Sequence, residues 1–203
     1  MLDRQMEQAK RPKAKGILHG KRIIVLGACC SIGRSMARAM MGCGAQVVVA
    51  DAAGEGLDRI GKAVPLALKG EPEDALRRVG RAWGEARLDA VVNLMPLRQP
   101  SRIDLNVAVL QAAVQAFMPA LTASEGQIVT VARRPEQALE VQAGAMVPAL
   151  LSAQGAFVDA LRRDGLALNL VNMGAHADAT ARPAVIGLLA RSMGPLNGTE
   201  LRL

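Results

Sequence analysis

The sequence predicts a doubly wound α/β fold, in which helices cover both faces of one parallel β-sheet. Three observations predict it: short apolar runs rich in β-branched residues, longer segments of helical character between them, and a regular alternation of the two along the chain. Strands that read as continuous apolar runs are typical of parallel sheets with both faces buried. The 203 residues suffice for a single domain with one core, arranged in three layers.

Each predicted element follows from this alternation. The apolar runs that predict strands are 22–26, 46–50, 63–68, 89–94, 127–131 and 166–171. The segments that predict helices are 32–41, 56–62, 72–86, 103–124, 136–163 and 183–193. Parallel neighbours require crossover connections, and these are right-handed, so we expect helices on both faces of the sheet.

Positive charge is concentrated at the N-terminal end of the chain. The net charge is +7, and residues 1–22 hold seven basic and two acidic side chains, so most of the excess lies there. We expect residues 1–19 to form a basic arm and residues 20–203 to form the folded domain. The arm leaves open one alternative function, the binding of nucleic acid or of an anionic surface. Aromatic residues are only 1% of the chain, which makes base stacking, and hence nucleic acid, a poor match.

The cysteines and histidines predict neither a disulfide framework nor a metal site. The three cysteines are an odd number, and two of them, Cys29 and Cys30, are adjacent. This usage indicates a reducing compartment, and we expect the cytoplasm. The two histidines, His19 and His176, lie far apart in the sequence and near no cluster of ligating side chains.

Two of the predicted helices lack a charged face. Twenty consecutive uncharged residues separate Asp104 from Glu125, and eighteen separate Glu140 from Asp159. A helix that covers a sheet normally presents charge to water, so we expect these two to be buried on both sides, by the sheet and by a second subunit. The glutamines and prolines within each segment argue against a membrane span. The sequence therefore predicts an oligomer that assembles through the helices near 104–124 and 136–163, and leaves homo- and hetero-oligomers open.

The stretch "IIVLGACCSIGRSMARAM" predicts a strand that ends at Gly27 and a helix that begins near Ser31. The amides at such a helix start can face a pyrophosphate, while Gly27 permits the turn and Gly33 permits close helix–strand packing. Asp51 ends the second strand, eighteen residues after Gly33, where an acid hydrogen-bonds an adenosine ribose and favours NAD over NADP. The alternative is that the two glycines serve only the steric needs of the turn.

From Gly20 onward, the chain resembles the short-chain dehydrogenase/reductase family, which has a Rossmann-like fold. The family's first loop is T-G-x-x-x-G-x-G, and this chain has "LGACCSIG", with Ser31 in place of the middle glycine. The family's N-N-A-G corresponds to "NLMP", and "RIDLNVAVL", "GQIVTVAR", "DGLALNLVNMG" and "NGTELRL" resemble later helix and strand segments. The resemblance implies that a dinucleotide would be held by Gly27, Ser31, Ile32, Gly33, Asp51 and Asn93.

The residues that the resemblance implies for catalysis are largely missing. The family uses a tyrosine as the proton donor, a lysine four residues later and a serine, because hydride transfer to a carbonyl leaves an alkoxide that an acid must meet. This chain has no tyrosine, and all six of its lysines precede residue 70. Leu150 and Gln154 stand at the tyrosine and lysine positions, and Ala132 or Arg133 at that of the serine. Asn106 is the one position of the catalytic tetrad that is retained.

These absences favour a protein that is not an enzyme, although they leave the question open. The segment after Gly174 is also too short for the lid that the family folds over its substrate. We therefore expect a non-catalytic subunit or scaffold, such as the inert partner of an active dehydrogenase, which requires no cofactor. One alternative is an NAD(P)-dependent oxidoreductase with an atypical proton donor, a water held by Asn106; the other is the anion binder described above. The sequence indicates no substrate or pathway.

Overall fold

A computed structural model describes residues 16–52, 56–136 and 141–203. It shows one seven-stranded sheet in the order β3-β2-β1-β4-β5-β6-β7, in which every neighbouring pair is parallel. The strands are β1 (Arg22–Leu26), β2 (Gln46–Asp51), β3 (Val64–Ala67), β4 (Ala90–Asn93), β5 (Gln127–Arg133), β6 (Ala167–Met173) and β7 (Glu200–Arg202). The order runs outward in both directions from β1 and β4, so the predicted doubly wound fold is confirmed.

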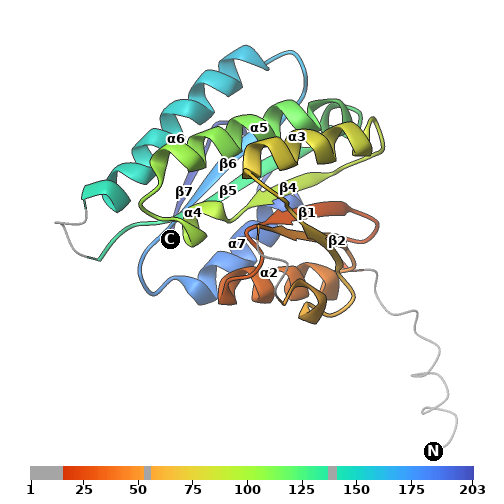
Figure 1. The fold of residues 1–203 in the computed structure, drawn as a ribbon, viewed down its shortest axis with the longest axis horizontal. Helices are drawn as coiled ribbons and strands as arrows, with labels where there is room; N and C mark the ends of the chain where they lie inside the picture. The colour runs from red at the N-terminus through yellow and green to blue at the C-terminus, as the bar shows by residue number, and fades with distance from the viewer. Residues whose placement is uncertain (1–15, 53–55, 137–140) are drawn as a thin grey trace, which may run out of the picture.

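Helices cover both faces of the sheet and complete the three layers (Figure 1). Helices α3, α5 and α6 pack on one face, and α2 and α7 pack on the other. The helices are α2 (Ser31–Gly42), α3 (Pro72–Trp83), α4 (Met95–Arg98), α5 (Ile103–Thr122), α6 (Val141–Ala160) and α7 (Asp178–Leu189), with a 3₁₀ turn, η1 (Leu57–Arg59).

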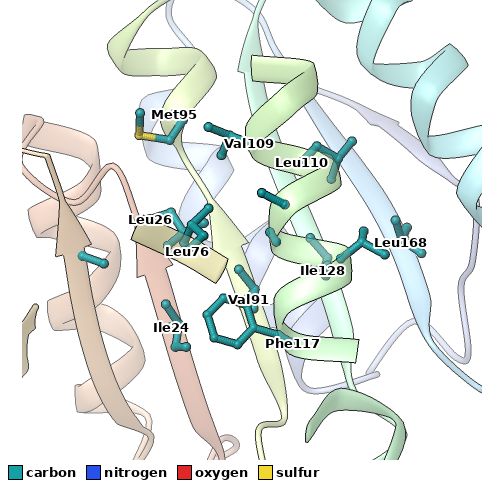
Figure 2. Packing of buried hydrophobic residues seen from close by; sticks show 14 of the residues in the cluster. Ile24, Leu26, Leu76, Val91, Met95, Val109, Leu110, Phe117, Ile128 and Leu168 are labelled. Carbon is teal, nitrogen blue, oxygen red and sulfur yellow. The ribbon is translucent and has the colours of Figure 1, made fainter. Parts of the chain in front are cut away.

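The larger core lies between the sheet and helices α3, α5 and α6. Phe117 of α5 is fully buried and lies close to Val91 of β4 (Figure 2). The ring of Trp83 meets that of Phe117 edge to face, with centroids 6.4 Å apart. Helices α3 and α5 approach closely at Gly80, where an added Cβ would lie 2.3 Å from the Ala116 carbonyl oxygen. The absence of a side chain at Gly80 therefore allows this contact.

Part of the predicted N-terminal arm belongs to the folded structure. Leu18 is fully buried in the core beneath α2, and its N–H donates to the Cys43 carbonyl over 2.9 Å. The rest of the predicted arm, residues 1–15, lies outside the described residues.

Several predicted helices differ from those observed. The helix predicted over 56–62 is only the short turn η1, because Gly56 and Gly61 at its ends both have positive φ angles. The last helix begins at Asp178 and includes Pro183, instead of beginning at that proline. Its acidic first residue complements the positive end of the helix dipole. The short α4 was not predicted, although its early proline is typical of a first helical turn.

Helices α5 and α6 are long and apolar enough, by length and composition, to cross a membrane. Both nevertheless pack against the sheet in this structure, and half of the most apolar window of α5 is buried. A helix in the core of a globular domain has the same composition.

Candidate functional site

The turn between β1 and α2 lies at the carboxyl ends of the strands, where doubly wound folds bind ligands. Gly27 has a φ angle of 73°, and a Cβ there would lie 2.9 Å from the carbonyl carbon of Leu94. A Cβ on Gly33 would lie 2.8 Å from the Cα of Ala28. The chain's own backbone therefore requires both glycines, as the steric alternative predicts, and their presence alone does not indicate a nucleotide.

A thiol caps the helix that follows this turn. Cys30 is the N-cap residue of α2, and its Sγ accepts a hydrogen bond from the Gly33 N–H over 3.2 Å. Sulfur is a weaker acceptor than the oxygen of the usual capping residues. Ser31, the first residue of α2, is exposed, and Ile32 is half-buried. Ser31 and Ile32 thus lie at the helix start, as predicted.

Asp51 is turned inward at the end of β2 and is only 1% exposed. Its Oδ2 accepts a hydrogen bond from the Cys29 N–H over 2.9 Å, and its Oδ1 accepts one from the Ala52 N–H over 2.8 Å. The Nε of Arg98 forms an ion pair with Oδ2 at 3.4 Å. Burial, and next the negative charge of Asp51, raise the pKa of the Cys29 thiol to about 11. Cys29 therefore stays protonated near neutral pH.

Asn93 and Asn106 hold the short helix α4 between them. Asn93 is fully buried, and its Oδ1 accepts a hydrogen bond from the Met95 N–H over 3.1 Å. The Nδ2 of Asn106 donates to the carbonyls of Gln99 and Arg102, both over 2.8 Å. The remaining polar atoms, Asn93 Nδ2 and Asn106 Oδ1, are buried and find no partner among the described residues. Asn106, which the resemblance assigns to the catalytic tetrad, therefore supports the backbone here.

Helix α6 offers no acid at the positions where the resemblance places the tyrosine and lysine. Leu150 is fully buried among apolar side chains, and Gln154 is also buried. Arg133, at the end of β5, is paired with Asp178 of α7. Asp159 is exposed near the C-terminal end of α6 and pairs with an arginine on the next turn. Both charged side chains are therefore engaged in ion pairs.

The connection that would form a lid is short. Strand β6 ends at Met173 and α7 begins at Asp178, so only residues 174–177 join them.

A cavity of about 250 Å³ lies at the opposite, amino edge of the sheet, lined in part by Gln127, Asn169 and Leu196. Within the described parts of the chain, no three His, Cys, Asp or Glu side chains gather in a metal-binding cluster.

The structure brings the predicted cofactor residues together but does not fit them to a dinucleotide. Parallel pairing places the ends of β1, β2 and β4, and hence Gly27, Asp51 and Asn93, at one edge. A ribose needs an accessible carboxylate, whereas Asp51 is only 1% exposed and its two oxygens accept hydrogen bonds from backbone N–H groups. The sequence did not predict that Arg98 pairs with Asp51. Its one signal was a basic residue in the short segment after the fourth strand.

Comparison with known proteins identifies the fold. No family model and no curated relative matches the chain. Among solved structures, a short-chain dehydrogenase/reductase of Burkholderia xenovorans superposes with a TM-score of 0.77 at 19% identity, covering 93% of this chain and 96% of that one. The Pseudomonas aeruginosa RhlG/NADP active-site complex gives 0.76 at 19% identity, covering 92% and 95%. A short-chain dehydrogenase of Salmonella enterica serovar Typhi gives 0.75 at 20% identity, covering 95% and 98%. At these identities the likeness shows a shared fold.

Proposed function

We propose that this chain is a non-catalytic protein of the short-chain dehydrogenase/reductase family that works as an oligomeric subunit. Helix α6 carries the proposal, because it joins two features in one element. It has apolar Leu150 where the resemblance places the acid, and it exposes a long uncharged surface. The shared fold supports the membership of the family, and the loss of the acid supports the loss of chemistry.

The exposed residues of α6 form a surface suited to another protein. From Val141 to Val158 the helix contains no charged residue, yet only 22% of its most apolar window is buried. Val141 itself is 73% exposed. The exposed residues before Asp159 are Val141, Gln142, Gly144, Pro148, Ser152, Gly155 and Ala156. Uncharged surface of this kind is typical of the centre of a protein–protein interface, where charged residues are depleted.

The chemistry of carbonyl reduction supports the same proposal. The alkoxide that hydride transfer creates must receive a proton from a positioned acid. The chain contains no tyrosine, and the amide nitrogen of Asn106 is committed to two backbone carbonyls. The active alternative would need a water on Asn106 Oδ1 to replace this acid.

Two measurements on the purified full chain test the proposal. Light scattering should give a mass at least twice that of the 21.3 kDa chain, or a larger complex when the chain is co-expressed with an active dehydrogenase. Mixing with NADH, NADPH and a panel of aldehydes and ketones should give no loss of absorbance at the nicotinamide band. A monomer that oxidises NADH would contradict the proposal on both counts.

We place this subunit in the cytoplasm, where its adjacent cysteines would stay reduced.

A further inference from the structure

Arg98 takes the interaction that this fold otherwise offers to the ribose of a dinucleotide. An acid at the end of β2 recognises the cofactor by accepting hydrogen bonds from the ribose hydroxyls, and it must be accessible to do so. Here Arg98 Nε lies 3.4 Å from Asp51 Oδ2, and the carboxylate is almost fully buried. We propose that Arg98 replaces the ribose as the partner of Asp51 and thereby closes this edge of the sheet to dinucleotides.

The segment that carries Arg98 is held at both ends. Asn93 accepts a hydrogen bond from the first residue of α4, and Asn106 donates to the carbonyl of Gln99, which directly follows Arg98. The Leu94 N–H also donates to the Leu26 carbonyl over 2.9 Å, which ties the start of α4 to β1. A guanidinium on an anchored segment loses less conformational freedom when it pairs, so the closed arrangement is favoured.

The turn between β1 and α2 closes the same site from the other side. The Cys29 N–H donates to Asp51, and the Gly33 N–H donates to the Cys30 thiol. Two of the amides near the helix start are therefore used within the chain and not offered to a phosphate.

Removal of the Arg98 guanidinium should leave the Asp51 carboxylate without a partner that the hydroxyl groups of a ribose can replace. Without Arg98, the buried carboxylate keeps the N–H groups of Cys29 and Ala52 and the hydrogen bond with the Cys29 side chain, but it loses its ion pair with the guanidinium. A buried charge that is left short of donors is unfavourable and recruits water or ligand hydroxyls. The cis-diol of an adenosine ribose supplies two such donors at once.

Calorimetric titration of the full chain with NADH, and separately with AMP, tests the proposal. The wild type should show no saturable binding of either. Arg98→Met, which keeps an apolar stem and removes the charge, should bind both at least about tenfold more tightly than the wild type. Asp51→Asn and the double variant also lack the ion pair but have no acid, so neither should gain affinity. Arg77→Met removes an exposed arginine of α3 that pairs with Asp74 and is the matched control.

Each outcome of the titrations either supports or overturns the proposal. Saturable NADH binding by the wild type would overturn the proposal, as would an Arg98→Met variant that binds no better than the wild type, or an equal gain in Asp51→Asn. A cooperative thermal transition in each variant establishes that it is folded, and Arg98→Leu, which also offers no donor to Asp51, gives the same readout if Arg98→Met does not fold. The proposal is separate from that of lost catalysis, because turnover and nucleotide affinity are measured independently.

Discussion

Helices α5 and α6 have the same length and similar composition, but different surroundings. Each has 20 residues, and their most apolar windows have mean hydropathies of 1.4 and 1.3. Half of that window is buried in α5, compared with 22% in α6. Helix α5 lies between α3 and α6 above the sheet, whereas α6 lies at the edge of this layer (Figure 1). Uncharged composition therefore predicts that a helix is covered, but it does not say whether its own chain covers it.

The largest expected effect comes from a substitution in the buried helix. Phe117→Ala should lower the free energy of unfolding by about 3–5 kcal/mol, because the ring is fully buried and its removal leaves a cavity. Val141→Ala on α6 is the matched control and should change it by less than about 0.5 kcal/mol, because that side chain is exposed. Urea unfolding measures both, and similar losses would remove the distinction between the two helices.

Two identical glycine substitutions sharpen the contrast. Gly80→Ala should destabilise the fold by about 1–3 kcal/mol, because the new Cβ would lie 2.3 Å from the Ala116 carbonyl oxygen between α3 and α5. Gly155→Ala on α6 meets no atom within 4 Å. It should raise stability by as much as about 1 kcal/mol, because alanine favours the helix. Thermal unfolding of the two variants should therefore move in opposite directions.

The pH dependence of stability should arise outside both helices, since neither uncharged segment titrates. Asp89, before β4, is nearly fully buried. Burial alone would raise its pKa, but hydrogen bonds from the Arg87 side chain and the Arg22 N–H, with the charge of Lys21, lower it below its usual value of 3.8. A lowered folded pKa means that the stabilisation is present at neutral pH and is lost as the pH falls through that folded value.

Asp89→Asn removes the stabilisation that the ionised carboxylate contributes, and it tests whether the pH dependence arises outside the two helices. The variant should be less stable than the wild type by about 1 kcal/mol at pH 7. The gap should narrow below about pH 4, as the wild-type carboxylate becomes protonated. Urea unfolding at several pH values measures the gap, and a constant difference down to pH 2 would show that Asp89 has no such role.

The substitution with the smallest expected effect on stability should change the oligomeric mass. Gly155→Glu places a charge on the exposed face of α6, where nothing lies within 4 Å, so the fold should tolerate it within about 0.5 kcal/mol. A buried, unpaired charge would nevertheless disrupt an interface at this face, and light scattering should show dissociation. Gly42→Glu, at the end of α2 on the opposite side of the sheet, also meets no atom within 4 Å and should leave the mass unchanged. Equal masses for the wild type, Gly155→Glu and Gly42→Glu would contradict assembly through α6.

The sequence was sufficient for β1 to β6, because each is a short apolar run, whereas β7 is not apolar and was expected only from the resemblance of "NGTELRL" to the family's last strand. The resemblance assigned Gly27, Asp51 and Asn93 to one cofactor site, and the structure brings them to one edge because parallel strands end together. The sequence could not supply the link between Asp51 and Arg98, because that pairing depends on where α4 lies in space. It also overextended the helix over 56–62, because two glycines with positive φ angles confine it to a single turn.

The contact between Trp83 and Phe117 gives the protein its own optical reporter. The chain has one tryptophan and no tyrosine, so its near-ultraviolet emission comes from a single indole. That indole is half-buried, donates from Nε1 to the Ala86 carbonyl over 2.8 Å, and meets the phenyl ring of α5 at its edge. A shift of this fluorescence to longer wavelength would signal that α3 has separated from α5.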